Sequence, residues 1–137
     1  MDTLLKRRIL VVDDEVDILT LVTARLRQSG YDVMTASDGL EGLERAQKER
    51  PDLILVDVSM PQMNGFQMIQ LLRLDGALKE TPVIVITASR QKDEAAWREQ
   101  VGVTQFILKP FESEELLGKV KEALQANGHS KIQERSQ

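Results

Sequence analysis

The stretch LILVDVSMP at residues 53–61 decides the fold of this chain. Its first four residues, Leu53–Val56, form a continuous apolar run between proline-containing turns. Such a run is typical of a strand that is buried on both faces of a sheet. Asp57 follows directly, where open α/β sheets place the groups that bind their ligands. The stretch therefore predicts a central strand with a functional carboxylate at its end, unless Asp57 only caps the following turn.

Composition and charge describe a globular chain and exclude several classes of function. The 137 residues are 42% hydrophobic and 29% charged, which suits one domain with its own core. A formal net charge of −4 gives no general reason to expect binding to nucleic acid or membranes. The absence of cysteine excludes disulfides, thiolate metal sites and cysteine nucleophiles, and is compatible with a cytoplasmic location. We expect no signal peptide, and no apolar run approaches the roughly 18–20 residues of a membrane span.

Strand-like and helix-like patterns alternate along the sequence. Apolar runs predict further strands at residues 9–12, 31–36, 82–86 and 106–108. Apolar residues at helical spacing follow each strand and predict helices within residues 14–29, 37–50, 64–75, 92–101 and 113–124. Helix caps are expected at Asp14, at Ser37 or Asp38, at Asn64 with Gln67, and at Ser113. The apolar side of the second helix is expected from Leu40, Leu43 and Ala46.

The alternation predicts an α/β fold with a doubly wound, five-stranded parallel sheet, because right-handed crossovers place helices on both faces. The carboxyl ends of the strands then share one edge. Four segments bring polar residues to that edge, namely Asp13 with Asp14, Asp57, Thr87 and Lys109. The domain is expected to span residues 1–126, and the polar segment 127–137 to be a frayed tail or a cut linker.

The residue types at this edge predict phosphoryl chemistry. Crowded carboxylates repel one another and attract a hard cation, and we expect this cation to be Mg²⁺. A lysine offsets negative charge and contacts phosphate, and a threonine hydroxyl donates to a phosphoryl oxygen. Together they fit a carboxylate that attacks a phosphoryl group and becomes an aspartyl phosphate. Taken singly, each residue also has a structural explanation as a helix start, a strand-end hydroxyl or a turn, so only their joint spacing carries the prediction.

Four motifs, in this order, resemble the receiver domains of two-component response regulators, the CheY-like superfamily. They are ILVVDDE at 9–15, LILVDVSMPQMNGF at 53–66, PVIVITA at 82–88 and FILKPF at 106–111. The resemblance covers roughly residues 7–126. It implies a flavodoxin-like (βα)5 fold with strand order 2-1-3-4-5, and a domain that accepts a phosphoryl group from a histidine kinase or a histidine phosphotransfer protein.

The resemblance also implies a role for each matching acid. Asp57 would be the residue that is phosphorylated. Asp14 and Asp57 would bind Mg²⁺ directly, together with the backbone carbonyl of Ser59. Asp13 would act mainly through a metal-bound water.

The remaining matching positions would carry the signal. Lys109 would pair with the phosphoryl oxygens or, before phosphorylation, with Asp57. Thr87 would move toward the phosphate and Phe106 would rotate inward behind it. The bond between Lys109 and Pro110 would be cis. The surface formed by the fourth helix, fifth strand and fifth helix would then control an effector protein or a homodimer, without direct contact to nucleic acid or membrane.

On this interpretation the chain is a signalling phosphoacceptor in the cytoplasm, and it is not an enzyme except that it assists its own phosphorylation and dephosphorylation. Three alternatives make different demands on the sequence. A haloacid-dehalogenase-type phosphatase would need an Asp-x-Asp pair right after the first strand and a cap or a longer core, and neither is visible in the sequence. A flavodoxin-like electron carrier would need a Ser/Thr/Gly-rich phosphate loop where this chain has Asp13-Asp14-Glu15. A degenerate receiver would bind partners without phosphorylation, and the presence of Asp14, Asp57, Thr87 and Lys109 argues against it.

Overall fold

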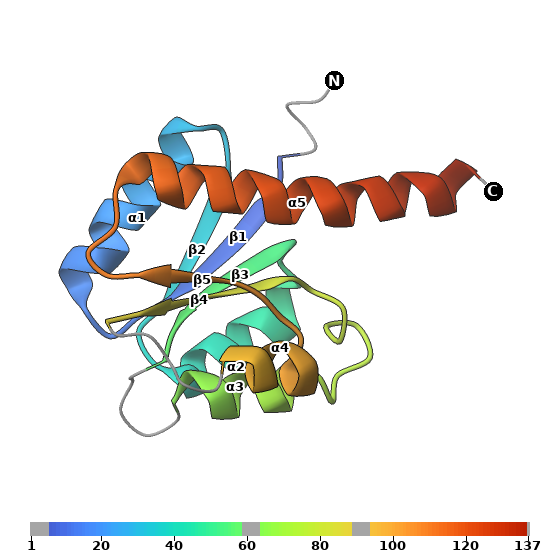
Figure 1. Cartoon of the computed structure of the whole chain (residues 1–137), viewed down its shortest axis with the longest axis horizontal. Helices are drawn as coiled ribbons and strands as arrows, with labels where there is room; N and C mark the ends of the chain where they lie inside the picture. The colour runs from blue at the N-terminus through green and yellow to red at the C-terminus, as the bar shows by residue number, and fades with distance from the viewer. Residues whose placement is uncertain (1–5, 59–63, 89–93, 137) are drawn as a thin grey trace.

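The computed structural model describes residues 6–58, 64–88 and 94–136, with side chains described up to residue 125 (Figure 1). Within these ranges the chain alternates five strands and five helices. In chain order they are β1 (Arg8–Val12), α1 (Val16–Gln28), β2 (Asp32–Ala36), α2 (Gly39–Glu49), β3 (Leu53–Asp57), α3 (Gly65–Leu72), β4 (Val83–Thr87), α4 (Glu94–Val101), β5 (Val103–Leu108) and α5 (Ser113–Ser136).

The strands form one parallel sheet in the order β2-β1-β3-β4-β5, which confirms the predicted topology. The register aligns the ends of the strands: Val12 pairs with Ala36 and with Val56, and Thr87 pairs with Leu108. The residues at and just beyond the strand ends therefore meet at one edge, called here the carboxyl edge. The opposite edge, where the strands begin, is called the amino edge.

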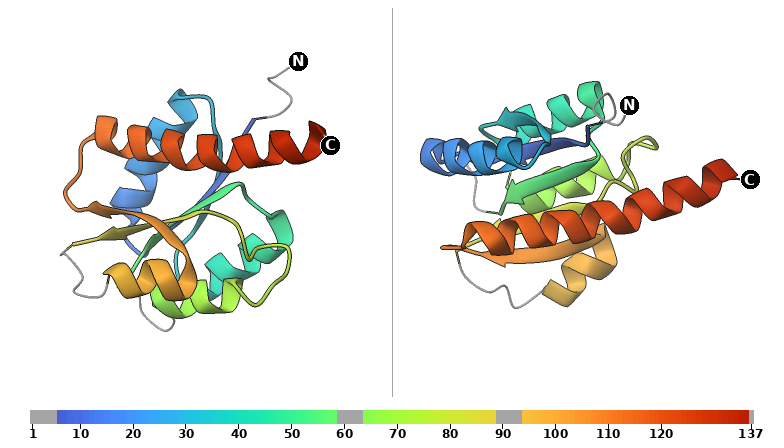
Figure 2. Two further views of the ribbon diagram at one scale, coloured as in Figure 1. Left: turned by 45° about the vertical axis from the view of Figure 1, so that its right-hand side comes forward. Right: turned by 90° about the horizontal axis from the view of Figure 1, so that it is seen from above.

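Helices cover both faces of the sheet, and each face has its own apolar core (Figure 2). Alternate residues of β1, such as Leu10 and Val12, pack with α2, α3 and α4, whereas Ile9 and Val11 pack with α1 and α5. The residues of β3 and β4 alternate in the same way and are all buried. Burial on both faces explains why these strands are continuous apolar runs. In the described part of the chain, no helix combines the length and the apolar character needed to cross a bilayer.

Two of the predicted helix caps are confirmed. Asn64 accepts a hydrogen bond from the Gln67 backbone N–H at 2.9 Å, and the Gln67 side chain accepts one from the Asn64 backbone N–H at 3.1 Å. Asp38 accepts from the Glu41 backbone N–H at 2.8 Å and so caps α2. These bonds satisfy backbone donors that have no partner inside the helix.

The caps predicted at Asp14 and Ser113 are wrong. Helix α1 begins at Val16, so its N-cap position is Glu15, which makes no capping bond from its side chain among the described residues. Ser113 lies inside the first turn of α5, and its hydroxyl accepts a hydrogen bond from Arg25 Nε at 2.8 Å. In both cases the polar side chain is one residue out of place for a cap, and that of Ser113 makes a tertiary contact instead.

Helix α5 also differs from the prediction at its end. It continues without a break through Ser136, and Figures 1 and 2 show it extending beyond the sheet. Residues 127–136 are thus helical where a frayed tail or a cut linker is expected, although they include Asn127, Gly128 and Ser130, which are not strong helix formers. The division of the chain into a domain of residues 1–126 and a tail stays a prediction.

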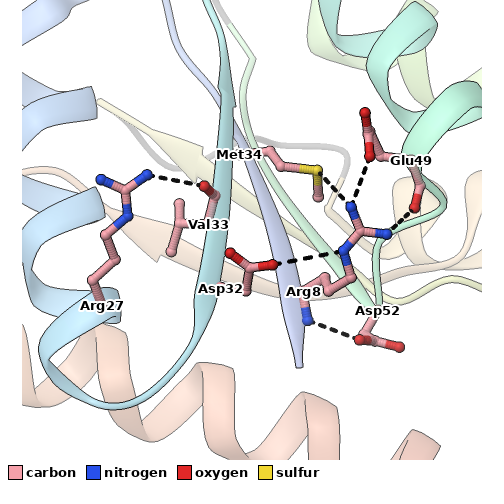
Figure 3. Close-up of polar contacts among 7 residues, drawn as sticks. All are labelled: Arg8, Arg27, Asp32, Val33, Met34, Glu49 and Asp52. Carbon is pink, nitrogen blue, oxygen red and sulfur yellow. Dashed lines mark hydrogen bonds and ion pairs between the residues drawn. The ribbon is translucent and has the colours of Figure 1, made fainter. Parts of the chain in front are cut away.

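The amino edge holds a cluster of paired charges around Arg8 (Figure 3). The Arg8 guanidinium donates to Glu49 Oε1 at 2.7 Å and to the Glu49 carbonyl at 2.5 Å, and it lies 3.8 Å from Asp32 Oδ2. The Arg8 backbone N–H donates to Asp52 Oδ2 at 2.8 Å. This cluster joins the starts of β1, β2 and β3 to the end of α2.

A second arginine fixes the loop before β4. Arg73 donates hydrogen bonds of 2.7–3.2 Å to the carbonyls of Leu78, Thr81, Val101 and Gly102. Burial lowers the pKa of this guanidinium, and its four hydrogen bonds to carbonyls offset part of the cost of burying its charge. The end of α3, the start of β4 and the end of α4 are thus held by one side chain.

Candidate functional site

The carboxyl edge brings together the residues that the sequence places after its strands. Asp57 is the last residue of β3 and is 4% exposed, and Thr87 is the last residue of β4 and is 2% exposed. Asp13 follows β1 directly and is fully buried, held by its backbone N–H donating to the Ala36 carbonyl at 3.1 Å. Lys109 follows β5, and its backbone N–H donates to the Thr87 carbonyl at 2.7 Å. The predicted convergence is confirmed as geometry, whereas the role of each residue stays a prediction.

Three carboxylates form a group that fits a hard cation. One oxygen from each of Asp13, Asp14 and Asp57 lies within 4.8 Å of the other two. Asp13 Oδ1 accepts a hydrogen bond from the Glu15 backbone N–H at 2.9 Å. Asp13 Oδ2 is buried and accepts no hydrogen bond from any described residue, although Lys109 Nζ lies 3.2 Å away. A buried carboxylate oxygen without a hydrogen bond, beside two further carboxylates, is a ligand set that suits Mg²⁺.

Burial governs the charge state of Asp13. It raises the pKa of this carboxyl above its ordinary value, because the charged form loses its hydration. The Glu15 backbone N–H and the positive charge of Lys109 oppose this effect without cancelling it. Folding therefore disfavours the ionised form of the Asp13 carboxyl. A bound cation would stabilise that ionised form.

Lys109 is shared among three acids. Its Nζ lies 2.7 Å from Glu15 Oε1, 3.2 Å from Asp13 Oδ2 and 3.7 Å from Asp57 Oδ2. Burial alone would lower the pKa of Lys109, but the hydrogen bond to Glu15 and the charges of Asp13 and Asp57 outweigh it and raise that pKa. The ammonium group is thus fixed in its charged form between the acids.

Two residues at this site were not singled out from the sequence. Glu15 provides the shortest contact of Lys109, and only its position in the run of three acids marks it. Gly65 begins α3 so close to the site that a Cβ atom there would lie 2.7 Å from the Asp57 carbonyl oxygen. The Asn64-Gly65 pair predicts a turn from the sequence, but the requirement for glycine at position 65 follows only from its closeness to the Asp57 backbone.

The remaining predicted residues are placed as follows. The Lys109–Pro110 peptide bond is cis. Phe106 lies in β5 opposite Val85, two residues before the level of Thr87, and its ring is partly buried. Ser59 lies outside the described residues, so the expected contribution of its backbone carbonyl stays a prediction.

Comparisons with known proteins agree with this arrangement. The chain matches the family described as "Response regulator receiver domain" over residues 9–121. It is 38% identical over 120 residues to the alkaline phosphatase synthesis transcriptional regulatory protein PhoP of Bacillus subtilis, an alignment that covers 88% of this chain and 49% of that protein. It is 35% identical over 117 residues to Protein PilH of Pseudomonas aeruginosa, covering 85% of this chain and 97% of that one.

Solved structures show the same likeness. The chemotaxis protein CheY4 of Vibrio cholerae superposes with a TM-score of 0.83 at 37% identity, covering 87% of this chain and 99% of that one. The strand order and the five-helix arrangement are shared with such neighbours. The chain spans about half the length of several of the curated relatives it matches, such as PhoP.

Proposed function

This chain belongs to the response-regulator receiver family of two-component signalling, and on that premise we propose that Asp57 accepts a phosphoryl group from a histidine kinase or a histidine phosphotransfer protein. The observation that carries the proposal is the placement of the Asp57 carboxylate. It is buried at the end of the central strand, in one group with Asp13 and Asp14 and 3.7 Å from Lys109 Nζ. Receivers are signalling phosphoacceptors, so the phosphatase and electron-carrier alternatives are set aside.

Receiver domains generally bind Mg²⁺ at an acidic cluster, and the residues here fit that ion. Asp14 and Asp57 would hold it directly with the Ser59 carbonyl, and Asp13 would hold it through water. When bound, Mg²⁺ supplies positive charge that offsets the negative charge of the transferring phosphoryl oxygens.

The chain's own residues would carry the transfer. An Asp57 carboxylate oxygen attacks phosphorus, while the bond from phosphorus to the imidazole nitrogen of the donor breaks. The Lys109 ammonium, already held in its charged form, turns from the acids to a phosphoryl oxygen. Thr87 donates its hydroxyl proton in a hydrogen bond to another phosphoryl oxygen. The same site would support slow hydrolysis of the aspartyl phosphate, which makes the signal temporary.

The output would follow from the added charge. Phosphorylation adds about −1.5 to −2 charges at neutral pH, which draws Thr87 and Lys109 toward the phosphate. Movement of Thr87 vacates space that the Phe106 ring fills, and this favours one of two existing conformers. The surface of α4, β5 and α5 changes with it and controls an effector or a homodimer. We propose a cytoplasmic location on the same premise, since histidine kinases act on receivers there.

The test is chemical labelling of the unmodified chain. Incubation with a small phosphodonor and Mg²⁺ is expected to add the mass of one phosphoryl group, and chelation of Mg²⁺ is expected to prevent it. Elution volume measured on the same sample reports whether phosphorylation drives dimerisation. A chain that gains no mass, even with excess donor and Mg²⁺, would be a degenerate receiver that binds partners without phosphorylation.

A further inference from the structure

Three aromatic rings from three elements form a row against the core on the face of the sheet that α2, α3 and α4 cover. The ring centroids of Phe66 in α3 and Trp97 in α4 are 4.8 Å apart, and those of Trp97 and Phe106 in β5 are 6.2 Å apart. Both pairs are tilted, a geometry that suits the charge distribution of aromatic rings. Arg98, the next residue of α4, places its guanidinium carbon 5.0 Å from the centroid of the Phe106 ring.

The backbone of Phe106 is held independently of its ring. Phe106 pairs with Val85 in the sheet, and its carbonyl accepts a hydrogen bond from Lys119 Nζ of α5 at 3.0 Å. A change at this position is therefore expected to move the ring about its side-chain bonds while the strand stays in place. The ring is partly buried against the core on the α4 side of the sheet, where it also lies close to Trp97 and Arg98.

We propose that Trp97 and Arg98 are positioning residues that hold the Phe106 ring in its resting position and so set the fraction of molecules ready to respond to phosphorylation. The inference rests on the proposed function, in which the ring moves toward the space behind Thr87. A guanidinium over a ring face attracts it only while the ring keeps that face toward it. The Arg98 contact is therefore made in the resting conformer and lost in the responsive one, which is the requirement for shifting an equilibrium between them.

The size of the effect follows from the contact. A cation over a half-buried ring is a weak interaction, so its removal is expected to raise the responsive population about two- to fivefold. When the responsive state is the minor one, the apparent affinity of a ligand that selects it rises by the same factor. Arg98→Ala should therefore bind the phosphoryl mimic beryllofluoride, in the presence of Mg²⁺, about two- to fivefold more tightly than the wild type.

The experiment combines this affinity with a population measurement. Backbone amide resonances of residues 103–108 are recorded without ligand and at saturating beryllofluoride and Mg²⁺. In unliganded Arg98→Ala these resonances should lie part of the way along the line that joins the two wild-type positions. A merely structural role for Arg98 would not place them on that line. The sole tryptophan of the sequence, Trp97, gives a parallel fluorescence signal for the titration.

Two variants serve as controls. Arg98→Lys keeps a cation on α4 and should restore most of the wild-type affinity and resonance positions. Arg45→Ala removes the same charge from an exposed position on α2 and should change neither. Unchanged affinity and resonances in Arg98→Ala would overturn the inference and leave the proposed function standing. A wild-type chain that fails to bind beryllofluoride with Mg²⁺ would overturn the proposed function itself, and the inference with it.

Discussion

The two edges of the sheet both carry a cluster of acidic residues around one basic residue, but the two clusters differ in their exposure to solvent. At the amino edge Arg8 is matched with Glu49, Asp32 and Asp52, and the side chains keep contact with solvent. At the carboxyl edge Lys109 is shared by Asp13, Glu15 and Asp57, and Asp13 and Asp57 are almost completely buried. Each edge thus places one basic side chain among several acids, but the amino edge leaves its acids in contact with solvent, whereas the carboxyl edge buries two of them where water is scarce.

The pKa directions of two acids express this difference. The hydrogen bond from Arg8 lowers the pKa of Glu49, so folding favours its charged form. Burial raises the pKa of Asp13, so folding disfavours its charged form. The charge of Glu49 therefore stabilises the fold at the amino edge. The charge of Asp13 destabilises it at the carboxyl edge, and a bound cation would remove that electrostatic cost.

The largest expected contrast lies between the two ends of β3. Asp57→Asn should abolish phosphodonor-dependent labelling, because the amide is nearly isosteric but is not a nucleophile. Asp52→Asn, at the start of the same strand, should label like the wild type. Intact mass after incubation with phosphodonor and Mg²⁺ measures both. Full labelling of Asp57→Asn would place the acceptor at another residue.

The next contrast concerns metal binding. Asp14→Ala removes a carboxylate from the predicted Mg²⁺ site and should weaken Mg²⁺ binding by roughly tenfold or more, the scale seen when even supporting groups of metal sites are lost. Asp32→Ala removes an acid of the amino edge and should leave Mg²⁺ affinity unchanged. A Mg²⁺ titration followed by fluorescence measures both variants. Equal affinities in wild type and Asp14→Ala would rule out the assigned site.

A third contrast compares the two ends of β4. Thr87→Ala should still be phosphorylated, because Asp57 and Lys109 remain, but it should lose most of the response at the surface of α4, β5 and α5. The Phe106 ring would no longer gain the buried area that favours the responsive conformer, an effect of ~1 kcal/mol or more. Amide shifts at residues 94–112, with and without beryllofluoride, report that response.

The matched control is Thr81→Ala, just before β4. Thr81 uses its backbone N–H toward the Leu78 carbonyl and its carbonyl toward Arg73, and both bonds survive the substitution. This variant should show the full set of remote shifts. If Thr87→Ala shows them as well, the signal reaches the surface by another route, most simply through Lys109 and the turn that follows it.

The strands and the carboxyl-edge residues could be predicted from the sequence because each leaves a local signal. A strand that is buried on both faces must be a continuous apolar run. An acidic residue is rarely buried, so it marks the point where such a strand reaches the edge of the sheet. The parallel topology then follows from the alternation of strands and helices. No contact between side chains had to be known to bring Asp13, Asp57, Thr87 and Lys109 together.

Features that depend on tertiary contacts could not be predicted in this way. The expected face of α2 included Leu40, which is 48% exposed, whereas Gly42 faces the core, where a Cβ atom would lie 2.9 Å from Val12. Helical spacing of apolar residues does not reveal a buried helix face on which a glycine lets the helix approach the sheet closely. The pairing of Glu15 with Lys109 likewise depends on where two long side chains meet across 94 positions of sequence.

The smallest expected effect is a change in the pH dependence of stability, which differs in sign between the acids of the two edges. Asp13→Asn removes the disfavoured charge and should raise the free energy of unfolding of the metal-free chain at neutral pH, by on the order of 1 kcal/mol. Asp13 has a raised folded-state pKa, so its cost is fully present above that pKa and is relieved as the pH falls through it. The advantage of Asp13→Asn should therefore shrink as the pH falls from neutral toward the ordinary aspartate value of 3.8.

Glu49→Gln should change the free energy of unfolding at neutral pH in the opposite direction. The folded-state pKa of Glu49 is lowered, so its stabilising contribution is present above the ordinary value of 4.5 and is lost as the pH falls through the folded-state value. Glu49→Gln should thus be slightly less stable than the wild type at neutral pH, and the difference should vanish in acid. Urea unfolding in chelator, from neutral pH to below the ordinary pKa values of 3.8 and 4.5, measures both variants. If Asp13→Asn were destabilising at neutral pH, ionised Asp13 would stabilise the fold, as Glu49 does beside Arg8, and the carboxyl edge would not hold an electrostatic cost.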